Sequence, residues 1–215
     1  MLTAYIIING IKTDPGQIDG WTDRLVTAIN TLSQHKAQAA EYYTGALNRR
    51  VGHAERVRKV AKMIGYYQRR DYAVHIVAHS HGALVATDAL SLRDRFDAEV
   101  FAAPVASLHL FAPAVDAEEV ADALEDSNAL RVRVCWAPGD PALKLGRLSR
   151  RLFGWIKVKG RPLGYGSLGL DPSWLQARQP GRVQVETYTG FKHSTWFEPA
   201  HFDATVEKIL HHDNP

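Results

Sequence analysis

One short motif combines a nucleophilic side chain with the residue types that a tight turn requires. Ser80 stands in the middle of Ala78-His79-Ser80-His81-Gly82, between an apolar run and a stretch with helical periodicity. A serine on a sharp strand-to-helix corner needs small residues two positions before and after it, because bulkier side chains would collide there. Such a corner exposes the hydroxyl group, so the motif predicts that Ser80 is a catalytic nucleophile.

The helix expected after the motif adds a second element of the same chemistry. Backbone amides at a helix N-terminus, together with the helix dipole, favour nearby negative charge. We therefore expect the amide of His81 to bind the oxyanion that forms when Ser80 attacks a carbonyl group. Side chains next to such a serine point away from its hydroxyl, so we expect His79 and His81 to pack or line the pocket rather than act as bases.

The sequence resembles the α/β-hydrolase family, particularly its lipase and esterase branches. The resemblance rests on the Ser80 motif, on the turn Asn9-Gly10-Ile11 and on the order of the remaining candidates, and it covers nearly the whole chain. The family usually has glycine at the first motif position, where this chain has Ala78. The resemblance implies a catalytic triad whose members follow in the order serine, aspartate or glutamate, histidine.

A histidine must take the proton of the serine hydroxyl, because the hydroxyl is a poor nucleophile near neutral pH. The implied order places this base late in the chain, where His193, His201, His211 and His212 are candidates. His193 follows the last expected strand, as in the similar enzymes. The other three lie on or beyond the expected final helix, where a solvated histidine is typical, so we predict that His193 is the base.

Two aspartates compete for the role of the carboxylate that orients this histidine. Asp140 follows the expected strand Arg131–Trp136, as in the commonest arrangement of the resembled family, although Asp before Pro141 is also typical of a helix N-cap. Asp116 precedes Glu119 by three residues, which is the spacing of a helix capping box. We predict that Asp140 is the triad acid and keep Asp116 as the alternative.

The turn after the first strand is expected to supply the second oxyanion donor. Many relatives read His-Gly there, and this chain reads Asn9-Gly10-Ile11. Glycine permits the backbone to approach a substrate closely. By resemblance, Gly10 makes the turn and the amide of Ile11 is the donor.

Strand and helix patterns alternate along the chain. Short apolar runs predict strands, and apolar residues that recur at three- and four-residue steps predict helices. The expected strands are Tyr5–Ile8, Ala39–Thr44, Ala73–Ala78, Leu108–Phe111, Arg131–Trp136 and Arg182–Tyr188. The expected helices include the following four. The first has an apolar stripe of Trp21, Leu25, Ala28, Ile29 and Leu32, and the second is capped by Asn48. The third is Gly82–Leu90, and the fourth runs from about Ala117 to Leu124.

This order predicts an α/β fold, because parallel neighbouring strands need a helical crossover between them. We expect a compact three-layer α/β/α sandwich with a mostly parallel central sheet. In the last strand, Val183 and Val185 alternate with polar residues, which is typical of an edge strand with one wet face. We therefore expect this strand at the rim of the sheet.

Length and composition fit one globular domain. The chain has 215 residues, of which 46% are hydrophobic and 23% are charged, so disorder, collagen-like repeats and coiled coil are disfavoured. The longest apolar runs fall far short of the roughly 18 residues of a membrane span, and no cationic leader opens the sequence. The single cysteine, Cys135, excludes an internal disulfide. We expect residues 1–215 to form one cytoplasmic domain.

The sequence contains no nucleotide-loop, dinucleotide, zinc-protease or calcium-loop pattern, so we expect catalysis without a cofactor or metal. The formal net charge of +3 is too small to predict nucleic-acid binding.

One segment is strongly cationic. No acidic residue occurs from Pro141 to Leu170, where basic residues alternate with apolar ones such as Leu145 and Trp155. A helix covering the sheet with solvated charges explains this pattern; alternatively, residues 143–161 contact an anionic membrane surface. By resemblance, residues 141–171 could also shape the pocket as a lid. The basic residues are Lys144, Arg147, Arg150, Arg151, Lys157, Lys159 and Arg161.

These observations together predict a serine hydrolase that acts on carboxylic esters or thioesters, with a preference for lipid-like acyl substrates. An acyltransferase with the same triad and a noncatalytic lipid- or protein-binding domain of the same fold remain alternatives.

Overall fold

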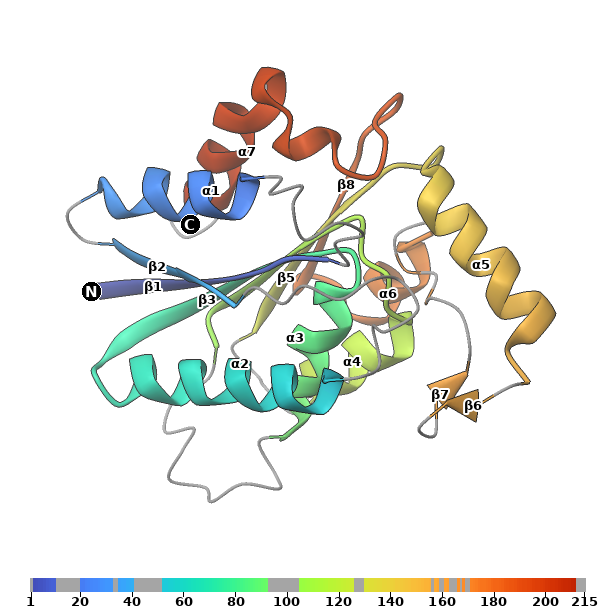
Figure 1. Cartoon of the computed structure of the whole chain (residues 1–215), viewed down its shortest axis with the longest axis horizontal. Helices are drawn as coiled ribbons and strands as arrows, with labels where there is room; N and C mark the ends of the chain where they lie inside the picture. The colour runs from blue at the N-terminus through green and yellow to red at the C-terminus, as the bar shows by residue number, and fades with distance from the viewer. Residues whose placement is uncertain are drawn as a thin grey trace.

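Six strands form a central sheet in the order β2-β1-β3-β4-β5-β8, and every neighbouring pair is parallel (Figure 1). The computed structural model describes residues 2–10, 20–32, 35–40, 52–92, 105–125, 130–155, 157–158, 161–162, 166, 168 and 171–211. The strands are β1 (Leu2–Ile8), β2 (His35–Ala39), β3 (Tyr72–His79), β4 (Ser107–Phe111), β5 (Arg131–Trp136) and β8 (Val183–Thr187).

The central strands are buried on both faces, which is why they appear in the sequence as unbroken apolar runs. In β1, Ile6 and Ile8 enter one hydrophobic cluster, whereas Tyr5 and Ile7 enter the other. The alternation follows from the two-residue period of a strand. The sheet thus divides the core into two apolar layers.

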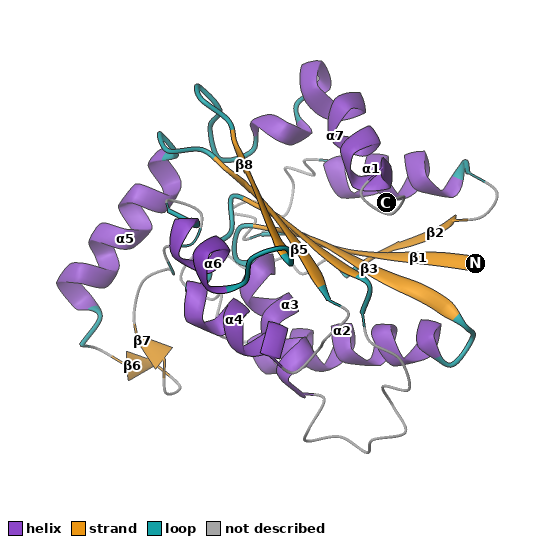
Figure 2. Cartoon of the chain, turned by 180° about the vertical axis from the view of Figure 1, so that it is seen from behind, coloured by secondary structure: helices purple, strands orange, loops and turns teal. Residues whose placement is uncertain are grey.

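Helices cover both faces of this sheet, as Figure 1 and the reverse view in Figure 2 show. One side carries α2 (His53–Gln68), α3 (Gly82–Ser91), α4 (Ala117–Glu125) and α6 (Ser173–Arg178). The other side carries α1 (Trp21–Asn30) and α7 (Pro199–His211). The predicted three-layer α/β/α architecture is therefore confirmed, with β8 at the sheet edge as expected.

Four further elements complete the described chain. Helix α5 (Pro141–Phe153) follows β5 and is succeeded by a small antiparallel pair, β6 (Lys157–Val158) and β7 (Arg161–Pro162). A short 3-10 helix, η3 (Thr195–Phe197), lies between β8 and α7. None of the described helices combines the length and apolarity needed to cross a bilayer.

Some predicted boundaries are wrong. The second strand is His35–Ala39 and not Ala39–Thr44, and residues 41–44 lie outside the described part. The N-cap of α2 is Gly52, while Asn48 also lies outside the described residues. Helix α1 ends at Asn30, so Leu32 falls beyond its apolar stripe and is exposed.

The register of the sheet brings several chain segments to one edge. His79 at the end of β3 is paired with Phe111, Phe111 with Cys135 of β5, and Cys135 with Glu186 of β8. Because the strands are parallel, the loops that follow β3, β5 and β8 all leave at this edge. Open α/β sheets bind ligands at the carboxyl ends of their strands.

Candidate active site

Ser80 occupies a strained corner between β3 and α3. Its φ of 55° lies in the left-handed region that non-glycine residues rarely adopt, and its backbone amide donates to the carbonyl of Phe111 at 3.0 Å. A Cβ on Gly82 would lie 2.6 Å from the carbonyl oxygen of Ile8 and 2.8 Å from that of Asn9. Glycine is therefore required where α3 begins against β1, and the strained turn holds Ser80 at the edge of the sheet.

The turn after β1 packs directly against this corner. A Cβ added to Gly10 would come within 2.8 Å of the Ser80 Cβ, so only glycine allows the two turns to meet. Ile11, the predicted second oxyanion donor, lies outside the described residues. His81, the predicted first donor, is the N-cap residue of α3 and directly follows Ser80.

A buried arginine holds the same turn from the other side. Arg56 of α2 donates from its guanidinium to the backbone carbonyl of Asn9 and, at 2.6 Å, to the Oδ1 atom of the Asn9 side chain. Its exposed fraction is only 4%. Sequence reasoning missed this residue, because a single arginine in an amphipathic helix gives no signal that it is buried.

Three side chains from separate loops form a continuous hydrogen-bonded chain. The Ser80 Oγ lies 2.8 Å from His193 Nε2, and His193 Nδ1 lies 2.8 Å from Asp140 Oδ2. A carboxylate only accepts, so Nδ1–H donates to Asp140 and Nε2 accepts from the serine hydroxyl. This tautomer leaves Nε2 able to take the serine proton.

Asp140 divides its two carboxylate oxygens between two tasks. Oδ2 accepts from His193, while Oδ1 accepts from the backbone amides of Ala142 and Leu143 at 2.9 and 3.1 Å and so caps α5. Burial acts to raise the pKa of this fully buried carboxyl group, but the hydrogen bonds from His193 and the two amides outweigh it and lower the pKa. The carboxyl group is thus kept ionised beside the imidazole.

His79 holds the loop that carries His193. Its Nε2–H donates to the backbone carbonyl of His193 at 2.8 Å, and its ring packs edge-on against Trp21 and Phe197. Burial lowers the pKa of His79 to about 3, reinforced by the nearby His193. The ring is therefore neutral at ordinary pH, and its packing role agrees with the expectation for a residue that flanks the nucleophile.

Asp116 has other partners. Its carboxylate forms a salt bridge with Arg150 of α5, and its backbone amide donates to the side chain of Glu119 at 3.2 Å, as in a capping box. Among the described contacts, it is Asp140 that meets His193.

The remaining late histidines lie elsewhere. The His201 ring packs against Phe191 at 4.7 Å between centroids. His211 is 3.6 Å from Glu207 on the exposed surface of α7, and His212 lies outside the described residues.

Solved structures share this fold at low sequence identity. An esterase from the archaeon Pyrobaculum calidifontis superposes with a TM-score of 0.58 and 17% identity, covering 99% of this chain and 76% of the esterase. The thermophilic carboxylesterase EstE1 from a metagenomic library gives a TM-score of 0.59 and 13% identity, covering 100% of this chain and 81% of the enzyme. A putative hydrolase of the alpha/beta superfamily from Xanthomonas campestris gives a TM-score of 0.55 and 14% identity, with coverages of 96% and 95%.

Comparison with curated protein sequences gave no match. Residues 48–163, more than half of the chain, match a family model that spans β3, the Ser80 corner, Asp140 and α5. That model describes an alpha/beta hydrolase of unknown function (DUF900), and the chain belongs to this family.

Proposed function

We propose that this protein is a serine hydrolase that cleaves carboxylic esters or thioesters through an acyl-enzyme. The observation that carries the proposal is the hydrogen-bonded chain from Ser80 through His193 to Asp140, with both links at 2.8 Å. The esterases of the same fold favour a carboxylic ester as the substrate class.

In the proposed mechanism, the Ser80 Oγ attacks the substrate carbonyl carbon as His193 Nε2 accepts the hydroxyl proton. The new C–O bond moves the carbonyl electron pair onto oxygen, and collapse of this intermediate expels the alkoxide or thiolate, which takes the proton from His193. Water then loses a proton to His193 and attacks the acyl-enzyme, which releases the acid and regenerates Ser80. Asp140 holds the imidazole and stabilises its positive charge throughout.

We propose that the backbone amides of His81 and Ile11 donate hydrogen bonds to the tetrahedral oxyanion. Gly10 supports this assignment, because its lack of a side chain leaves the backbone of the first turn close to Ser80. Removal of one such donor typically costs about 3 kcal/mol of transition-state stabilisation.

A fluorophosphonate probe tests whether Ser80 is an activated nucleophile. We expect wild type and Ser91→Ala to be labelled and Ser80→Ala to remain unlabelled. Ser91 is a suitable control because it lies at the far end of the same helix, where its hydroxyl donates to the carbonyl of Thr87. Folded wild-type protein that resists labelling would support the noncatalytic binding domain instead.

Turnover of p-nitrophenyl esters of increasing acyl length then measures the reaction. We expect Ser80→Ala and His193→Ala each to reduce kcat by at least about 10³-fold without unfolding the protein. Adding alcohols or amines tests the acyltransferase alternative. If the acyl group passes to the added nucleophile far faster than to water, the enzyme is a transferase and the hydrolase proposal fails.

A further inference from the structure

Helix α5 is buried along one side and exposes apolar side chains on another. Leu143 and Gly146 are buried against the body of the protein. On the outer side, Leu145, Leu148 and Leu152 are 68%, 51% and 55% exposed. Their three- and four-residue spacing places them along one face of the helix, so an apolar stripe one and a half to two turns long points into solvent.

This concentration of exposed apolar side chains is unusual for the molecule. Of the nine large apolar residues exposed in the described part of the chain, five lie between positions 145 and 155. Single exposed leucines are ordinary, but a contiguous exposed patch indicates a binding surface. We term the stripe of Leu145, Leu148 and Leu152 the outer α5 face; Phe153 and Trp155 are exposed beside it at the end of the helix.

Cationic side chains run beside this face. Lys144, Arg147 and Arg151 are exposed on α5, and at 100° per residue all three fall on the same flank of the leucine stripe. The sequence from residue 141 to residue 170 contains no acidic side chain, and Asp171, just beyond this range, interacts electrostatically with Arg147. Arg150 is different, because it points toward the body and pairs with Asp116.

The charge on this face selects among the partners that could cover it. A second copy would bring three like-charged side chains up against three more, which is unfavourable at a buried interface. An anionic lipid surface attracts the cations and offers a hydrocarbon layer to the leucines, and Trp155 would lie at the headgroup boundary, where tryptophan is favoured.

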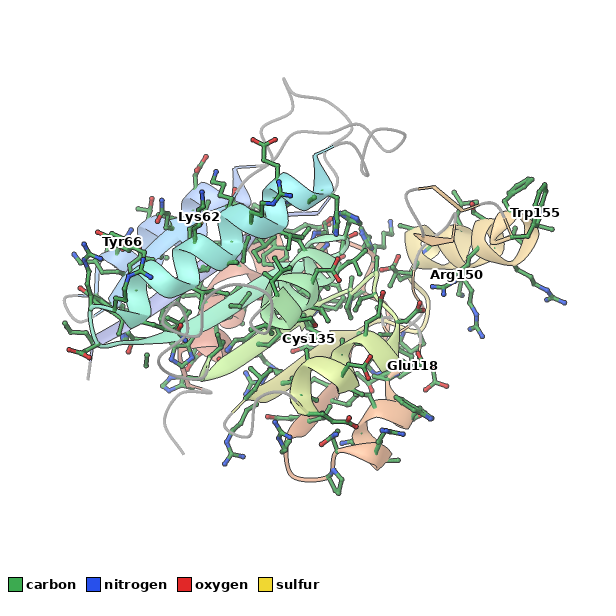
Figure 3. All side chains as sticks on the ribbon, turned by 90° about the horizontal axis from the view of Figure 1, so that it is seen from below. Lys62, Tyr66, Glu118, Cys135, Arg150 and Trp155 are labelled. Carbon is green, nitrogen blue, oxygen red and sulfur yellow. The ribbon has the colours of Figure 1, made fainter. Side chains whose placement is uncertain are left out.

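The position of the helix allows such contact without rearrangement. Figure 3 shows α5 extending away from the body of the molecule, with Trp155 at its outer end and Arg150 along its length. Its other end begins at Asp140, whose carboxylate contacts His193. A membrane that holds α5 would therefore lie close to the candidate active site.

We propose that the outer α5 face binds the surface of an anionic phospholipid bilayer. The binding itself is independent of the proposed hydrolase activity. Its functional consequence rests on that activity: esters dissolved in the bilayer would be delivered to Ser80 from the adjacent surface.

Vesicle co-sedimentation tests the binding directly. We expect wild type to sediment with phosphatidylcholine vesicles that contain about 30% phosphatidylglycerol, but not with phosphatidylcholine alone, and to dissociate as salt rises from about 0.05 M to about 0.5 M. The triple variant Lys144→Gln, Arg147→Gln, Arg151→Gln should bind about 100-fold more weakly, at roughly fivefold for each cation.

The apolar contribution has its own variant and a matched control. The triple variant Leu145→Ser, Leu148→Ser, Leu152→Ser should lose at least about tenfold in affinity for each leucine. The control is Leu2→Ser with Leu32→Ser, two exposed leucines elsewhere, and it should bind as wild type does. Every variant should hydrolyse a short soluble ester at the wild-type rate, which shows that it is folded.

Three outcomes would overturn the proposal. Wild type could fail to bind vesicles, or its binding could ignore anionic lipid and salt. Alternatively, sedimentation equilibrium without lipid could show a dimer that the leucine variant abolishes, in which case a second copy covers the face. Failure of the hydrolase proposal appears separately, as absent turnover of the soluble ester by a wild type that still binds vesicles.

Discussion

Replacement of Asp140 separates the two tasks of its carboxylate. Oδ1 caps α5 through two backbone amides, and Oδ2 holds His193 in its tautomer. Asparagine retains an oxygen for the cap, but its NH₂ group would then face His193 Nδ1 and donate to it. The imidazole proton must move to Nε2, which can no longer accept the proton of Ser80.

The orienting task and the capping task predict effects of different size on kcat and on the free energy of unfolding. For Asp140→Asn, the wrong tautomer should lower kcat about 10⁴-fold, which corresponds to about 5 kcal/mol of activation free energy. Asparagine is as good an N-cap as aspartate, so the free energy of unfolding should fall by less than about 1 kcal/mol. Asp140→Ala should lose similar activity and about 2 kcal/mol of stability, at the upper end for a cap because both amides lose their buried acceptor.

Ester turnover and urea unfolding followed by tryptophan fluorescence measure these quantities on the same samples. The pKa of Asp140 is below its ordinary value, so its charge stabilises the folded state above about pH 4 and this stabilisation is lost as the pH falls further. The stability advantage of wild type over Asp140→Asn should shrink accordingly. If Asp140→Asn keeps more than a tenth of wild-type kcat, Asp140 is only a helix cap and the triad assignment is refuted.

Three further predictions concern the surroundings of the site. Gly82→Ala should unfold the protein or cost several kcal/mol of stability, because its Cβ would lie 2.6 Å from the backbone oxygen of Ile8; wild-type thermal stability in this variant would contradict the described corner. His79→Leu should lower kcat by removing the hydrogen bond that holds His193, whereas His79→Gln, which keeps an N–H donor, should restore much of it; equal kcat in the two variants would argue against a positioning role. Asp116→Asn removes the ion pair with Arg150 and should cost at most about 1 kcal/mol in urea unfolding, while ester turnover stays within about twofold of wild type; a loss of turnover comparable to that of Asp140→Asn would reverse the assignment of the two aspartates.

The sequence alone is sufficient to locate the strands whose side chains are buried on both faces of the sheet. β3 and β5 appear as apolar runs, and their predicted positions are confirmed within one or two residues. The apolar pattern misplaces β2, because β2 is an edge strand in which only Ala37 is buried. A strand that contributes one side chain to the core leaves almost no hydrophobic pattern to find.

The residues of the candidate site also differ in whether the sequence could predict them. Ser80 could be found from local chemistry, since a strained corner restricts the residue types around it, and His193 and Asp140 followed from the order that the resemblance implied. Their catalytic roles stay predictions. The contacts of Arg56 with Asn9 and of His79 with the His193 carbonyl join segments far apart in the chain, so no local pattern indicated them.

The helix cap on Asp140 is compatible with the proposed orienting role, although the sequence presented the two as alternatives. A carboxylate buried as deeply as this one would tend to take up a proton, and a neutral acid orients and stabilises an imidazolium poorly. The hydrogen bond from His193 contributes most to lowering the pKa of the group, and the backbone amides of Ala142 and Leu143, which donate to Oδ1 at the positive end of α5, lower it further. The capping contacts therefore help His193 to keep Asp140 charged in a buried position, and that charge is what allows Oδ2 to hold His193 with its proton on Nδ1.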